Sequence, residues 1–263
     1  MTRKIIGVII MVALLVFGCF TGIMFYRQYA DAESSATTFE ELQEQIKNTE
    51  ELPNSETEHP TIEEAGNTPA ETEPTVFDKY RPLQEQNSDV VGWIFIEGTE
   101  INYPVMQTPD NPDYYLKHSF EKTWSDYGVP YVDEACTVGI SNNLVIYGHN
   151  MKNGSMFSGL VQYKSKGFFE THPIICFDTV DEPGQYRVIA AFRYNTNNET
   201  FKYNEHSDMD EAEFAEYVAS CKSRSIYDTG VTAEYGDVLI TLSTCEYTYT
   251  NGRFVVVAKK IIE

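Results

Sequence analysis

A cysteine, a histidine and an arginine that could support acyl-transfer chemistry lie at the ends of predicted β-strands. Cys245 closely follows an apolar, β-branched run over 238–242, and Arg253 directly precedes a second such run over 254–258. Between them, Asn251-Gly252 is a strong hairpin signal. Because hairpin strands are adjacent and antiparallel, we expect Cys245 and Arg253 to be neighbours at one edge of a sheet.

The three side chains have complementary chemistry. A thiol becomes a good nucleophile as the thiolate, which a nearby cation or histidine favours, so Cys245 is the candidate nucleophile. Arg253 cannot act as a base, but its rigid fork of donors can hold an oxyanion. His149 follows a short buried-strand run, 144–147, and a glycine, so it is placed at a strand end as the proton carrier.

Structural interpretations compete with these assignments. A cysteine on a strand without such companions is usually a small core residue. The other histidines are interpreted as loop, strand-border or solvated residues: His118, His172, His59 and His206. Ser243 and Thr244 flank the candidate nucleophile, and by strand alternation Ser243 shares its face with Cys245, which predicts a supporting hydrogen bond from Ser243.

These motifs resemble the sortase family of cysteine transpeptidases from Gram-positive cell surfaces. The resemblance rests on TLSTC at 241–245, an arginine at the start of the strand that ends in VVVAKK, and an upstream YGHN that contains His149. It covers residues 76–263, with histidine, cysteine and arginine in the family's order. A helix before the catalytic strand, and helical structure at 77–86 ahead of the first strand, resemble class B.

The resemblance implies a reaction and its partners. Cys245 would attack the threonine carbonyl of a C-terminal sorting signal in a secreted protein, and an amine of a lipid-linked peptidoglycan precursor would then resolve the acyl-enzyme. The protein cargo becomes anchored to the cell wall, and no cofactor and no metal are implied. An NPQTN-like signal and one ending in TG both remain open. Two other hypotheses are a cell-surface cysteine endopeptidase and a non-catalytic, membrane-tethered binding module.

The N-terminus predicts a membrane anchor. Residues 5–26 carry no charge and, at about 1.5 Å per residue, form a helix of roughly 33 Å, enough to cross a bilayer core. Residues 1–4 carry Arg3 and Lys4, so the positive-inside rule places them in the cytoplasm and the rest of the chain outside. Cleavage as a signal peptide after Ala30-Asp31-Ala32, or lipidation at Cys19, are the alternatives.

Residues 27–75 are predicted to be an acidic extracellular linker. They are rich in Glu, Thr, Asn and Pro and poor in large apolar side chains, so they cannot bury enough surface to fold alone. FEELQEQI is the exception, because Phe39, Leu42 and Ile46 have helical spacing and predict a short helix.

Composition excludes several function classes. The chain of 263 residues has 19 Lys and Arg against 40 Asp and Glu, a net charge of −21, so a nucleic-acid partner is excluded. Its five cysteines show no disulfide framework and no CxxC motif, which argues against a metal site.

The fold class is mostly β. Helices are expected over 156–163 and from a cap at Ser207 or Asp208 to about Arg224. Eight short strands are expected over 90–96, 101–107, 128–133, 143–147, 168–177, 186–194, 238–242 and 254–258. Many short strands and few helices predict an eight-stranded barrel, with one longer helix before the catalytic strand. The sortase resemblance implies the same architecture.

Overall fold

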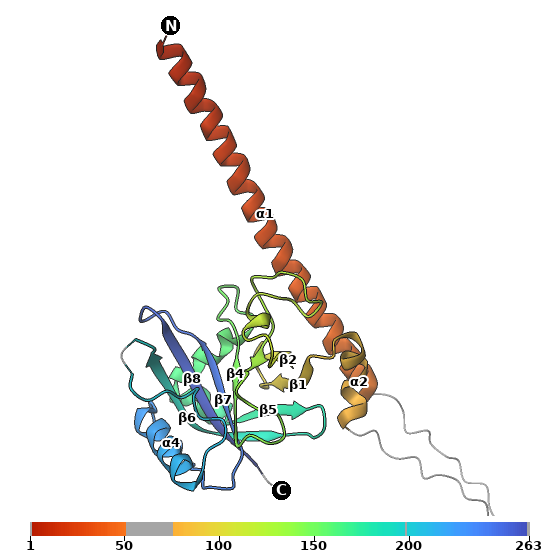
Figure 1. Cartoon of the computed structure of the whole chain (residues 1–263), viewed down its shortest axis with the longest axis vertical. Helices are drawn as coiled ribbons and strands as arrows, with labels where there is room; N and C mark the ends of the chain where they lie inside the picture. Colours follow the sequence, from red (N-terminus) through yellow and green to blue (C-terminus); the bar gives the residue numbers. More distant parts are fainter. Residues whose placement is uncertain (1, 51–75, 198, 262–263) are drawn as a thin grey trace, which may run out of the picture.

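The computed structural model describes residues 2–50, 76–197 and 199–261 (Figure 1). Eight strands close into a barrel in the order β1-β2-β3-β4-β7-β8-β6-β5. The strands are β1 (Val90–Phe95), β2 (Asn102–Met106), β3 (Tyr131–Val132), β4 (Asn143–Tyr147), β5 (Ile174–Thr179), β6 (Gln185–Asn195), β7 (Leu239–Cys245) and β8 (Gly252–Lys260). The helices are α1 (Thr2–Glu50), α2 (Val76–Gln86), α3 (Lys166–Thr171) and α4 (Glu211–Arg224), with 3₁₀ turns η1 (Tyr114–Leu116) and η2 (Phe157–Lys164).

Strand β7 is central to the arrangement of the site. It pairs in parallel with β4 and antiparallel with β8. Six of its seven residues are buried, because the barrel core covers one face and the outer layer of the molecule covers the other. Its apolar, β-branched sequence suits a strand buried on both faces. The ends of β4, β7 and β8 therefore have fixed positions relative to one another.

The predicted eight-stranded barrel is confirmed, and the predicted bounds of β4 are those observed. The third strand is shorter than predicted, covering only Tyr131–Val132. Gly128 has a positive φ of 58°, a turn conformation that is incompatible with a continuous strand from that residue.

The predicted strand over 168–177 is wrong in its first half. Residues Lys166–Thr171 form α3, because the Ser165 side chain accepts a hydrogen bond from the backbone N–H of Phe168 and caps the helix. Pro173 follows the helix, and β5 begins at Ile174. The predicted helix over 156–163 is present as the 3₁₀ helix η2.

Helix α4 begins later than predicted, with Asp210 as its cap instead of Ser207 or Asp208. The Asp210 carboxylate accepts hydrogen bonds from the backbone N–H groups of Ala212 and Glu213, and the Glu213 side chain accepts from the N–H of Asp210. This capping box satisfies the free donors of the first turn. Helix α4 packs against β6, and the hydroxyl of its Tyr217 lies 2.7 Å from Thr241 Oγ1, which links the helix to β7.

The expected extended linker over 27–75 is not observed at its N-terminal end. Residues 27–50 continue α1, and the predicted helical face of Phe39, Leu42 and Ile46 is buried in the core cluster. The Phe39 ring lies 5.0 Å from that of Tyr103, between centroids. Burial against the barrel supplies the stabilisation that this acidic segment lacks alone. Residues 51–75 lie outside the described residues.

The N-terminal half of α1 extends away from the barrel (Figure 1). By length and composition it is the one helix, among the described residues, that is long and apolar enough to cross a membrane. Its large apolar side chains are exposed, from Ile6 to Tyr26. Within the part of the chain that the structure describes, most of this apolar surface is left uncovered by the barrel.

Candidate active site

Cys245 and Arg253 are direct cross-strand partners at the open end of β7 and β8. Both side chains are partly buried. The loop between the strands covers residues 246–251, and Asn251 adopts a positive φ of 61° that the turn requires. The predicted adjacency of Cys245 and Arg253 is confirmed.

His149 reaches the same edge through the parallel pairing of β4 with β7. Just beyond the strand, the N–H of Gly148 donates to the carbonyl of Ser243 at 3.1 Å, and Thr244 Oγ1 donates to the Gly148 carbonyl at 2.7 Å. A Cβ at Gly148 would lie 2.5 Å from the Phe157 ring, so only glycine allows this close approach. The chain therefore places His149 beside the end of β7.

The imidazole of His149 has a defined hydrogen bond. Its Nε2 lies 2.7 Å from the Leu116 carbonyl oxygen, which can only accept, so Nε2 carries the hydrogen. Burial lowers the pKa of His149 below its ordinary value, and the positive charges of Lys117 and Arg253 lower it further, against the opposing effects of the Leu116 carbonyl and Asp126. At neutral pH the ring is neutral, with Nδ1 available to accept a proton.

A pocket of about 460 Å³ collects the candidate residues. It is lined by all five site residues that the sequence singled out: His149, Ser243, Thr244, Cys245 and Arg253. Much of the remaining lining comes from the segments 131–134 and 202–205. Among the described residues that line this pocket, His149 is the one histidine.

Ser243 and Thr244 have different surroundings. Ser243 is 1% exposed, and its Oγ lies 2.7 Å from the hydroxyl of Tyr203. Burial raises the pKa of Tyr203 to about 12, so the phenol keeps its proton at physiological pH. Thr244 joins β7 to the backbone that carries His149, through its bond to Gly148. Ser243 thus connects β7 to the β6–α4 loop, and Thr244 connects it to the end of β4.

Three residues at the site were missed by the sequence prediction: Asn150, Tyr203 and Glu246. Asn150 Nδ2 donates to the backbone carbonyl of Cys245 at 2.8 Å, and the backbone carbonyl of Asn150 accepts from the Tyr247 hydroxyl at 3.0 Å. Asn150 and Glu246 each directly follow a candidate catalytic residue, and this position in the sequence could have identified them as site residues. Tyr203 lies in a polar loop, and nothing local distinguishes it.

Glu246 is a buried carboxylate, 4% exposed, beside the candidate nucleophile. It accepts hydrogen bonds from Lys164 Nζ at 2.5 Å and from the backbone and hydroxyl of Thr248 at 2.9 and 2.6 Å. Burial alone would raise the pKa of Glu246, but these bonds outweigh it and hold the pKa below its ordinary value. The carboxylate therefore ties the start of the β7–β8 loop to η2.

The donors available for an oxyanion near Cys245 are restricted. The backbone N–H of Glu246, the next residue, already donates to the Gly252 carbonyl at 3.0 Å. Arg253 Nη1 also donates to that carbonyl, at 3.1 Å, which leaves other N–H groups of the guanidinium for a ligand. In the described part of the chain, no cluster of three His, Cys, Asp or Glu side chains could hold a metal ion.

Two other described histidines have the structural positions that were predicted for them. The ring of His118 stacks on Tyr114 at 3.8 Å, and its Nδ1 lies 2.7 Å from the Tyr114 carbonyl. The ring of His172 stacks on Phe168 at 4.0 Å. Both side chains pack on aromatic rings outside the pocket.

Comparisons with known proteins agree with this geometry. The family described as "Sortase domain" matches residues 94–261. Sortase B of Listeria monocytogenes is 36% identical over 189 residues, which cover 71% of this chain and 75% of that protein.

Solved structures give the same result. A Staphylococcus aureus sortase B–substrate complex superposes with a TM-score of 0.71 and 27% identity, over 88% of this chain and 96% of that one. A structure of sortase B complexed with triglycine superposes with a TM-score of 0.72 and 27% identity, over 88% of this chain and 98% of that one. The transpeptidase hypothesis is thereby confirmed over the endopeptidase and the binding module. This chain belongs to the sortase family and is a sortase B-like cysteine transpeptidase.

Proposed function

We propose that this transpeptidase cleaves a C-terminal sorting signal after threonine and transfers the cargo protein to an amine of a cell-wall peptide precursor. The observation that carries the proposal is the pairing of Cys245 with Arg253 across β7 and β8, at a pocket that His149 also lines. A nucleophile, an oxyanion donor and a proton carrier are the groups that acyl transfer needs.

In the first half of the reaction, Cys245 Sγ attacks the threonine carbonyl while the neutral His149 ring accepts the thiol proton at Nδ1. Arg253 holds the tetrahedral oxyanion. The imidazolium then gives its proton to the departing amine as the C–N bond breaks, and a thioester on Cys245 remains.

In the second half, the acceptor amine attacks the thioester carbonyl and His149 takes the amine proton. The C–S bond breaks, and His149 returns the proton to the thiolate. A relative in complex with triglycine supports a glycine-type peptide amine as one acceptor class. The pocket wall from 202–205, joined to β7 by Tyr203 and Ser243, is suited to contact the signal peptide.

We propose that α1 anchors the enzyme in the cell membrane as a single pass, with residues 1–4 in the cytoplasm and the barrel outside. The uncharged run over 5–26 and the preceding Arg3 and Lys4 support this orientation. Both the emerging cargo and a lipid-linked peptidoglycan precursor are present at that membrane surface. The partners are therefore secreted proteins with sorting signals and the lipid-linked precursor, and not nucleic acid.

The test is product analysis with the full-length enzyme and signal peptides that end in TN, TG or TS, with and without triglycine. Cleavage after threonine, a thioester adduct on Cys245 and a triglycine conjugate are expected. The Cys245→Ala variant must give neither adduct nor conjugate. Turnover that yields only the hydrolysed peptide, indifferent to triglycine, would contradict the proposed acceptor reaction.

A further inference from the structure

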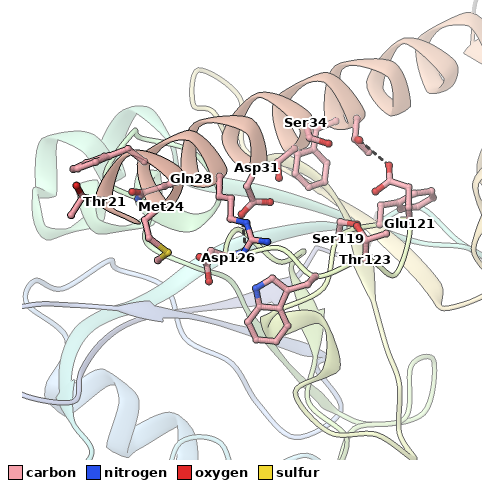
Figure 2. Close-up of a pocket in the computed structure, with 16 residues that line it drawn as sticks. Thr21, Met24, Gln28, Asp31, Ser34, Ser119, Glu121, Thr123 and Asp126 are labelled. Atoms are coloured by element: carbon pink, nitrogen blue, oxygen red, sulfur yellow. Dashed lines mark hydrogen bonds between the residues drawn. The ribbon is translucent and has the colours of Figure 1, made fainter. Parts of the chain in front are cut away.

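A tryptophan is held at the surface beside the apolar helix. Trp124 is 70% exposed, and within the fold its ring meets that of His118 edge to face, 5.9 Å away between centroids. It lines a cavity of about 890 Å³ between α1 and residues 119–126, together with Met24 and Phe25 of α1 (Figure 2). The backbone next to Trp124 is bonded to α1 at Asp31, which lies five residues, about 8 Å, beyond the end of the uncharged run.

The loop that carries Trp124, here the docking loop (residues 117–126), is fixed to α1. Asp31 accepts a hydrogen bond from the backbone N–H of Asp126 at 2.8 Å, and Thr38 donates to Glu121 at 2.8 Å. Figure 2 shows the loop residues facing the helix across the cavity. The position of Trp124 relative to the apolar helix is thus set by the fold.

Two further exposed aromatic residues lie on α1 within the five residues that precede Asp31. Tyr26 and Tyr29 are 73% and 65% exposed. Tyr26 is the last residue of the uncharged run, and Trp and Tyr are the residues enriched at membrane–water interfaces. With Trp124 they form an aromatic belt around the point where α1 leaves its apolar segment.

The wall that α1 gives to the cavity changes from the apolar Met24 and Phe25 to the charged Arg27 and Asp31. Beyond Asp31 the lining is mixed, because Phe39 lies there among polar groups. The change over residues 24–31 matches the boundary between acyl chains and headgroups. At about 1.5 Å per residue, the 22 residues before this level span roughly the thickness of the hydrocarbon core.

We propose that the docking loop and α1 residues 21–29 form a membrane-docking surface, in which Trp124 inserts into the phospholipid headgroup layer of the bilayer that α1 spans. The inference rests on the proposed membrane anchoring by α1. The occupant of the cavity is lipid, because the apolar segment of α1 continues directly into its wall. Docking fixes the tilt of the barrel on the membrane.

The docking surface is linked to the active site. Leu116, which precedes the docking loop, accepts the Nε2–H bond of His149. The β7–β8 hairpin end of the barrel lies on the side toward which the apolar half of α1 extends (Figure 1). Docking therefore holds the pocket near the membrane surface, where a lipid-linked acceptor is presented.

The chain offers its own probe, because it contains only two tryptophans. Trp93 is 6% exposed and donates to Asn102 Oδ1 at 2.6 Å within the barrel. The full-length Trp93→Phe variant therefore reports Trp124 alone, and the Trp124→Phe variant, the matched control, reports Trp93 alone. Each is reconstituted in phosphatidylcholine vesicles whose lipids are brominated either close to the glycerol or close to the chain end.

Stronger quenching of the Trp93→Phe variant by the bromine close to the glycerol, with no quenching of the Trp124→Phe variant, is the expected result. Equal, weak quenching of both variants in protein that floats with the vesicles would overturn the proposal. Emission typical of a buried indole without bromine quenching would mean that a second protein copy covers Trp124, which also overturns it. If Trp93→Phe does not fold, the difference between the unsubstituted protein and Trp124→Phe gives the same signal.

Peptide transfer in the same vesicles separates this proposal from the proposed function. Quenching without turnover supports docking and contradicts the sorting reaction. Turnover without quenching supports the sorting reaction and contradicts docking. Trp124→Glu is expected to slow transfer to a lipid-linked acceptor several-fold and to leave transfer to soluble triglycine unchanged. Equal loss with both acceptors would contradict a role in docking.

Discussion

Lys164 and Glu246, 82 residues apart in the sequence, form an ion pair of 2.5 Å directly behind Cys245. The carboxylate is almost fully buried, whereas the lysine retains some exposure. Removing the lysine would leave a buried charge short of one partner, and that is costly. The pair therefore holds the β7–β8 loop, and with it the register of Cys245 and Arg253.

We predict that Lys164→Met lowers the free energy of unfolding by about 1–3 kcal/mol and reduces kcat/KM. Lys166→Met is the matched control, because Lys166 pairs with Glu170 at 3.9 Å on an exposed helix face and should change stability by less than about 0.5 kcal/mol. Denaturant unfolding and peptide kinetics measure both effects. Equal effects of the two variants would show that the pair does not hold the loop.

Glu246 also gives a dependence of stability on pH. Its folded-state pKa lies below the unfolded value near 4.5, so the folded state favours the charged form. The stabilisation is present above that value and is lost as the pH falls through it towards the folded-state pKa. Glu246→Gln should therefore flatten the loss of stability between neutral and acid pH, as measured by denaturant unfolding at several pH values.

Arg253 is predicted to act through its fork of donors. Arg253→Ala should lower kcat by about 10²–10³-fold, the usual effect of removing an oxyanion donor. Arg253→Lys should recover little of this activity, because lysine lacks the planar fork. Arg187→Lys, at an exposed position of β6, serves as the control and should leave kcat unchanged. Full activity of Arg253→Lys would reduce the role of Arg253 to that of a positive charge.

The pH profile of the enzyme should report His149. The reaction begins from a neutral ring, so activity falls as the pH drops through the lowered pKa of His149. Lys117 lowers that pKa and Asp126 raises it. Lys117→Gln should therefore move the acid limb of kcat/KM to higher pH, and Asp126→Asn should move it to lower pH. NMR titration of the ring checks the assignment, and shifts in the same direction for both variants would contradict it.

The pH dependence of the free energy of unfolding should also report the protonation of His149. Because the folded-state pKa of His149 lies below 6.5, the unfolded chain binds the proton more readily. This part of the stability is full above pH 6.5 and decreases as the pH falls below it. His149→Asn should lose less stability than the unsubstituted protein between about pH 7.5 and 5.5, by denaturant unfolding. A steeper loss in the variant would be inconsistent with a depressed pKa.

The contact of α1 with the barrel should depend on its apolar face. Leu42 is 2% exposed, and Leu42→Ala is expected to weaken docking of residues 27–50 by about 2–3 kcal/mol. Hydrogen exchange of α1 amides in the full-length protein measures this loss of protection. Glu41→Ala is the control, because Glu41 is exposed on the same turn. Unchanged protection in Leu42→Ala would mean that this half of the helix does not rely on the barrel.

The amino-acid sequence by itself determined the features that depend on neighbouring residues. The apolar runs around Cys245 and Arg253, with Asn251-Gly252 between them, predicted a hairpin and hence their adjacency, because turn type and strand alternation are local properties. The same periodicity predicted eight strands. The YGHN and TLSTC motifs identified His149 and Cys245, and the arginine at the start of the following strand completed the three residues on which the proposed chemistry rests.

Only the tertiary structure decided what depends on distant partners. His149 comes to line the same pocket as Cys245 through the pairing of β4 with β7, two strands far apart in the sequence, which no local pattern encodes. Residues 27–50 are acidic, and their apolar face around Leu42 stabilises the helix only when the barrel covers it. The ion pair of Glu246 with Lys164 likewise requires the folded barrel, because burial and distance, rather than residue type, set the strength of such a pair.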